Sequence, residues 1–161
     1  MTPMCNPRRT IASLNQPGGQ ADPFNLDRFI EAQEEVYAHV LAELRRGRKE
    51  THWMWFIFPQ LAGLGHSPTS QYYAIKSLVE ARQYLEQPVL GKRALECAEL
   101  LLQIQGRSAS QIFDPPDDLK LRSSMTLFAY VTGPGSVFAR VLEKYFHGKP
   151  DERTLELLEQ I

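Results

Sequence analysis

The sequence is poor in cysteine. Its 161 residues include two, Cys5 and Cys97, and so distant a pair does not make the disulfide framework typical of small secreted domains. A chain of this length can bury one hydrophobic core without disulfides or structural metals. We therefore expect a protein of the reducing cytosol and predict a cytoplasmic location.

Long apolar runs and an excess of charge are also missing. The longest apolar run, residues 53–58, is far shorter than the roughly 20 residues that span a bilayer. Arg8 and Arg9 are not followed by an apolar segment, which argues against a secretory signal. The net charge of −1 argues against a generic nucleic-acid-binding surface. We expect neither a membrane nor a nucleic acid as partner; the oligomeric state stays open.

The first 24 residues differ in composition from the rest. They hold a Gly-Gly pair, and Ile11 and Leu14 are their only large aliphatic residues. Such a segment buries too little apolar surface to offset the entropy lost on ordering. We predict a disordered tail over residues 1–24 and a single helical domain over residues 25–161. The tail's prolines are Pro3, Pro7, Pro17 and Pro23.

Apolar residues recur at helical spacing through most of the remaining chain. Start and stop signals divide this pattern into separate helices, because serine and aspartate favour the residue before a helix and glycine the residue after it. The predicted helices cover residues 26–46, with Asn25 as N-cap and Gly47 as stop, 78–85 after Ser77, 89–104, a short turn after Ser108, 116–131 after Asp114, 137–146 after Ser136, and a last helix after Asp151.

The segments 116–131 and 53–58 indicate most about the centre of the fold. The helix at 116–131 has apolar residues on several faces, which is typical of a central helix. The run at 53–58 reads equally as buried strand or buried helix. We favour a helix, because no other convincing strand exists to pair with it. The sequence thus predicts an all-α, compact multihelical fold.

Polar residues flank the apolar run at 53–58. His52 and Gln60 lie at its two ends, and His66 follows the Gly63-Leu64-Gly65 hinge. Two histidines beside a flexible loop could act as a catalytic acid–base pair, since histidine titrates near neutral pH. Alternatively, each could donate a hydrogen bond that fixes a turn. Both alternatives remain open on sequence grounds.

A second polar cluster, Lys120 to Thr126, lies on the predicted central helix. Arg122 and Thr126 are four residues apart and share a face with Ser123. A buried guanidinium needs an anionic partner, which could be Asp118 one turn earlier or the phosphate or carboxylate of a ligand. Lys120 is expected at the surface.

Aromatic residues could complete a ligand site. Trp53 and Trp55 are two residues apart and point in different directions on a helix, so at least one is expected in the core. Trp53 or Tyr72 could stack on a planar ring. No phosphate-binding loop, nucleophile motif or metal-ligand spacing occurs; we expect no metal and no resident cofactor.

Four segments together resemble a known bacterial family, domain of unknown function eighteen-ten (DUF1810): residues 29–48, 52–68 (HWMWFIFPQLAGLGHSP), 77–91 and 117–128 (DDLKLRSSMTLF). The resemblance extends over nearly all of the chain after the tail and implies a compact all-helical domain. It implies no particular activity. Some members carry the label calpastatin, but this sequence has neither inhibitory repeats nor the overall disorder of such an inhibitor.

Two functional hypotheses follow. In the first, a small anionic metabolite, such as a nucleotide or an ADP-ribose-like molecule, binds between the 52–66 segment and the 120–126 helix. Arg122, Ser123 and Thr126 would hold its anionic group, and His52 or His66 would move a proton if a reaction occurs. In the second, an exposed aromatic surface binds a partner protein without chemistry. The position of the aromatic side chains separates the two hypotheses.

Overall fold

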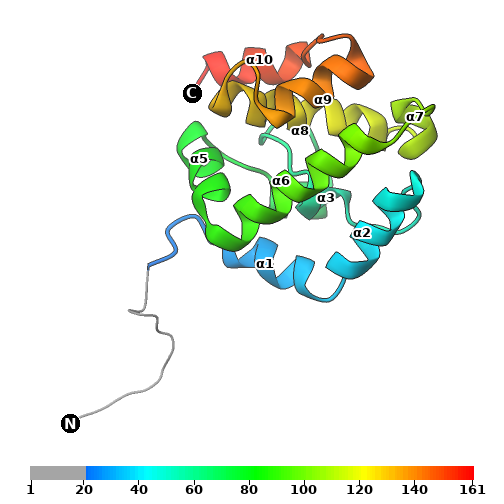
Figure 1. Ribbon diagram of the computed structural model, residues 1–161. Helices are drawn as coiled ribbons and strands as arrows, with labels where there is room; N and C mark the ends of the chain where they lie inside the picture. Colours follow the sequence, from blue (N-terminus) through cyan, green and yellow to red (C-terminus); the bar gives the residue numbers. More distant parts are fainter. Residues whose placement is uncertain (1–20) are drawn as a thin grey trace.

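The computed structural model describes residues 21–161, and over this range the protein is all-α, as predicted (Figure 1). None of the described helices is both long and apolar enough to cross a membrane. The helices are α1 (Asp27–Glu34), α2 (Tyr37–Arg46), α3 (Met54–Ile57), α4 (Pro68–Tyr73), α5 (Leu78–Glu86), α6 (Pro88–Gln103), α7 (Ala109–Ile112), α8 (Asp117–Thr132), α9 (Val137–Phe146) and α10 (Glu152–Glu159).

Helix α8 is the central helix that the sequence predicts. It contacts α5, α7, α9 and α10, and Leu121 and residues 123–128 are all buried. Helix α6 crosses the molecule, packing on α2, α5 and α9, and α1 and α2 lie at the opposite end from α9 and α10 (Figure 1). The core between them is rich in aromatic side chains. Its largest fully buried members are Trp53, Tyr84, Phe29, Phe113 and Phe128.

The predicted helix over 26–46 is two helices, and this part of the prediction is wrong. The chain turns at Glu35 and Val36, so that α1 contacts both α3 and α6 while α2 contacts α6. Asn25 is not the N-cap; it has a positive φ of 52°. The Asp22 carboxylate instead accepts hydrogen bonds from the backbone N–H groups of Leu26 and Asp27. This satisfies two of the orphan donors at a helix start.

The predicted tail lies mostly outside the described residues, since 1–20 are not described. Its last four residues, 21–24, are described, and Phe24 packs against the hydrophobic core. Together with the Asp22 cap, this contact shows that Asp22 and Phe24 pack as part of the helical fold.

Most predicted helix starts are confirmed. The hydroxyls of Ser77 and Ser136 and the carboxylate of Asp151 each accept a hydrogen bond from a backbone N–H in the first turn. Ser108 and Gln111 form the reciprocal capping box. Asp114 does not cap α8: that helix starts at Asp117 after Pro116, which follows a cis peptide bond.

The segment at 53–58 forms the short helix α3, so the choice of helix over strand is confirmed. Helix α4 was not predicted; Ser67 is its N-cap and Pro68 its first residue. A parallel bridge of Leu61 with Ile75 joins the segment before α4 to the segment after it. The Ile75 N–H donates to the Gln60 carbonyl, and the Ala62 N–H donates to the Ile75 carbonyl, at 2.8 and 2.7 Å.

Ser124 offers a test of the packing around α8. It is fully buried, and within residues 21–161 its Oγ is the one buried side-chain nitrogen or oxygen without a hydrogen-bond partner. An unsatisfied buried hydroxyl is destabilising, and alanine favours a helix more than serine does. We expect Ser124→Ala to raise the free energy of unfolding by about 1 kcal/mol in urea denaturation. A loss of stability would contradict this. Ser123→Ala, which removes a bond to the Leu119 carbonyl, is the control and should give no gain.

Candidate functional site

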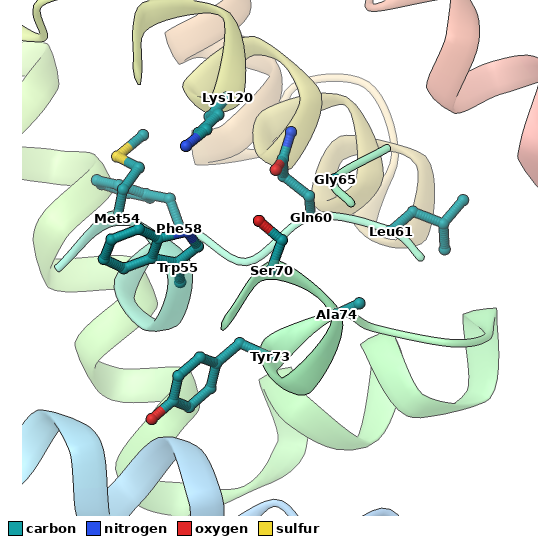
Figure 2. Close-up of a pocket in the computed structure, with 10 residues that line it drawn as sticks. All are labelled: Met54, Trp55, Phe58, Gln60, Leu61, Gly65, Ser70, Tyr73, Ala74 and Lys120. Atoms are coloured by element: carbon teal, nitrogen blue, oxygen red, sulfur yellow. The ribbon is translucent and has the colours of Figure 1, made fainter. Parts of the chain in front are cut away.

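A narrow hollow opens between the 54–61 segment, the 65–74 segment and the first turn of α8 (Figure 2). Its interior has room for about one water molecule. Lys120 is the one residue with a full charge among those that line it. The lining residues are Met54, Trp55, Phe58, Gln60, Leu61, Gly65, Ser70, Tyr73, Ala74 and Lys120.

Three segments distant in sequence each supply a polar group to this hollow. Gln60 comes from the loop after α3, Ser70 from α4 and Lys120 from α8, and Figure 2 shows all three around the same space, while the Tyr73 ring points away. An amide, a hydroxyl and an ammonium all donate hydrogen bonds. The arrangement is therefore suited to an anionic or acceptor-rich group.

Local backbone geometry brings Ser70 to this position. A Cβ atom at Gly65 would lie 2.5 Å from Ser70 Cβ and 2.7 Å from Ser70 Oγ. Glycine is thus required for the loop to pass so close to α4. The Ser70 hydroxyl accepts a hydrogen bond from the Ser67 hydroxyl at 2.9 Å, and Ser67 in turn caps α4. These contacts hold one wall of the hollow.

The charge of Lys120 is only loosely paired. Its Nζ lies 3.6 Å from Asp117 Oδ1, whereas the other carboxylate oxygen, Oδ2, lies 2.9 Å from Lys49 Nζ. Lys120 Nζ also lies 5.5 Å from the centroid of the Trp55 ring, within the range of a cation–π contact. One carboxylate shared by two ammonium groups leaves one net positive charge beside the hollow.

Neither predicted histidine lines the hollow. His52 and His66 are both exposed, and the His66 backbone carbonyl accepts a hydrogen bond from the Gln71 amide. The titratable groups that do line it are Lys120 and Tyr73. Burial raises the pKa of the Tyr73 hydroxyl above its ordinary value, with a smaller contribution in the same direction from Tyr72. Tyr73 therefore remains protonated at neutral pH.

The three polar residues predicted on α8 face elsewhere. Arg122 Nε donates to the Lys149 carbonyl at 2.9 Å, and its guanidinium lies over the Phe146 ring. Arg122 and Asp118, one of the two pairings that the sequence left open, do not form an ion pair within residues 21–161; Asp118 Oδ1 accepts from the Leu119 N–H.

The hydroxyls of Ser123 and Thr126 are used inside the fold. They donate to backbone carbonyls one turn earlier on α8, and Thr126 Oγ1 also accepts from the Asp151 N–H at 2.8 Å. Thr126 thereby ties α8 to the start of α10.

Of the other predicted ligand residues, Gln60 lines the hollow, whereas Trp53 and Tyr72 do not. Trp53 is only 1% exposed, and its indole N–H donates to Glu43 at 2.9 Å. Tyr72 is 54% exposed and borders a different, open groove next to Arg28. Their neighbours Trp55 and Tyr73 line the hollow in their place.

Sequence reasoning missed Lys120, Trp55 and Ser70. The signal for Lys120 was its place one turn before the buried Ser124 on a helix that is buried on several faces, so that a long side chain there extends along a neighbouring segment. Ser70 was not predicted as part of the site, because α4 was not predicted. Within residues 21–161 no cluster of three or more His, Cys, Asp or Glu side chains is placed to hold a metal ion.

The fold and the hollow define a multihelical domain with one cationic side chain at a narrow pocket. The chain belongs to the family described as "Protein of unknown function (DUF1810)", which it matches over residues 23–158. It is similar to the crystal structure of the conserved hypothetical protein Rv1873 from Mycobacterium tuberculosis, with 56% sequence identity and a TM-score of 0.84 over 86% of this chain and 99% of that one. No protein of curated function matches.

Proposed function

We propose that this protein binds a small molecule through an anionic group, a carboxylate or a phosphate, that enters the hollow beside Lys120. The observation that carries the proposal is the loosely paired ammonium of Lys120, 3.6 Å from a carboxylate that it shares with Lys49. Gln60 and Ser70 border the same space and add hydrogen-bond donors.

The size of the hollow limits how such a ligand binds. With room for about one water molecule, it accepts one end of a ligand, while the rest extends over Trp55 towards solvent. A nucleotide or an ADP-ribose-like molecule would therefore enter by its anionic end alone. The role proposed is binding without an acid–base step, since His52 and His66 do not line the hollow.

The alternative, a partner protein on an aromatic surface, has less support. Such a surface needs adjacent exposed rings, but Trp53 is buried and Trp55 and Tyr73 are only partly exposed. Tyr72 is the one largely exposed member of the group. We therefore favour the small ligand.

The experiment is a thermal-shift screen of carboxylated and phosphorylated metabolites, followed by titration of each hit. A ligand at about 100 times its Kd adds roughly 2.7 kcal/mol to the stability, which such a screen detects. We expect Lys120→Met to weaken binding at least tenfold, about 1.4 kcal/mol. Lys92→Met, which changes an exposed lysine on α6, is the matched control.

Arg122→Ala separates this site from the one that the sequence alone indicates. Because Arg122 contacts Lys149 and Phe146, its removal should leave the affinity of a screened hit unchanged. A loss with Arg122→Ala but not with Lys120→Met would move the site to the other face of α8. Equal affinity in wild type and both variants would refute an anion site on this helix.

A further inference from the structure

Lys49 and Lys120 both approach the carboxylate of Asp117 beside the hollow, but at different distances. Lys49 lies 2.9 Å from Asp117 Oδ2 with 8% of its side chain exposed, whereas Lys120 lies 3.6 Å from Oδ1 with 27% exposed. Attraction between charges grows as they come closer and as water is excluded. The carboxylate of Asp117 is therefore held mainly by Lys49.

Lys49 is fixed independently of Asp117. Its ammonium lies 5.2 Å from the centroid of the buried Trp53 ring, and its backbone N–H donates to the Ile112 carbonyl at 2.9 Å. Both contacts attach Lys49 to the core behind the hollow, and Lys49 is not one of the residues that line it. It can thus act on a ligand through Asp117 rather than by direct contact.

From this geometry we infer that Lys49 is a positioning residue for the site: by holding Asp117 it keeps that carboxylate from neutralising Lys120. This inference rests on the proposed function. Two ammonium groups and one carboxylate leave one net positive charge, and the other lining residues carry none. The site therefore selects ligands that present a single negative charge, such as a monocarboxylate.

The test uses benzoate as the probe and the Trp55 indole N–H signal in NMR spectra as the readout. In Lys49→Met, Asp117 turns fully to Lys120, and we expect benzoate to bind about fivefold more weakly. In Lys49→Met/Asp117→Asn, the competing carboxylate is gone, and affinity should return to within about twofold of wild type. A merely structural role for Lys49 predicts no such rescue. Unchanged affinity in Lys49→Met, or a double variant as weak as the single one, would overturn the inference.

A second measurement needs no ligand and separates the two proposals. The acetylation rate of Lys120 by acetic anhydride, read by peptide mass spectrometry, falls when a carboxylate holds the ammonium, because only the neutral amine reacts. We expect slower acetylation in Lys49→Met than in wild type, and recovery in the double variant. Equal rates in all three proteins would overturn the role of Lys49. Failure of benzoate and of every screened metabolite to bind wild type, with the expected acetylation pattern, would refute the proposed function alone.

Discussion

Arg28→Met should lower the free energy of unfolding by about 3–5 kcal/mol, the cost of leaving one partner of a buried ion pair alone. Arg28 Nη2 lies 2.8 Å from Glu80 Oε2, and the two side chains are 4% and 3% exposed. Without Arg28, the Glu80 carboxylate would remain in the core with only its bond from the Lys76 N–H. Urea denaturation at neutral pH measures the loss.

The expected loss of stability is large because every N–H group of the Arg28 guanidinium donates a hydrogen bond. A guanidinium has five N–H groups, and here they meet five acceptors: the carbonyls of Tyr72, Phe24, Asn25 and Ala74 and the carboxylate of Glu80. One side chain thereby joins the start of α1 to α4 and α5. Lysine, with three donors, cannot replace it, so Arg28→Lys should also be destabilised.

Arg140→Met, at an exposed position on α9, is the control and should change stability by less than about 0.5 kcal/mol. A similarly small loss in Arg28→Met would contradict the role assigned to this residue. The double variant Arg28→Met/Glu80→Gln removes both charges and should be more stable than Arg28→Met alone, which separates the unpaired charge from lost packing.

Helix starts could be predicted where a single side chain determines them. Ser77, Ser108 and Asp151 cap their helices through contacts within three residues, so the local sequence holds the whole signal. The break at Glu35 and Val36 could not be predicted, because the apolar spacing continues in phase through it. The break depends on tertiary packing, of α1 on α3 and α6 and of α2 on α6.

The candidate site could be predicted only in part. The sequence indicated the space between the 52–66 segment and α8, where the hollow lies, but selected Arg122 rather than Lys120. Two residues correspond to roughly 200° around a helix, so these side chains leave α8 on nearly opposite sides. Because α8 is buried on several faces, its apolar pattern does not define which side meets the other segment. That direction depends on tertiary packing, as does the pairing of Arg28 with Glu80.

Glu43 gives the second large effect, and it depends on pH. Its side chain is 3% exposed and accepts four hydrogen bonds, from the backbone N–H groups of Glu50 and Thr51, the Thr51 hydroxyl and the Trp53 indole. Burial acts to raise the pKa of this carboxyl, but the hydrogen bonds outweigh it and lower the pKa from 4.5 to about 2. A lowered pKa means that the ionised form stabilises the fold.

This stabilisation is present above pH 4.5, the ordinary pKa, and is lost as the pH falls towards 2. The shift corresponds to roughly 3 kcal/mol. In Glu43→Gln the amide oxygen can still accept from the indole, but the charge is absent, so we expect that variant to be about 2 kcal/mol less stable at pH 7. The other carboxyl groups are the same in wild type and in Glu43→Gln, so their titration cancels in the difference between the two. The difference between wild type and variant in urea denaturation should therefore shrink between pH 5 and pH 2.5, and a constant difference would show that folding does not lower the pKa of Glu43.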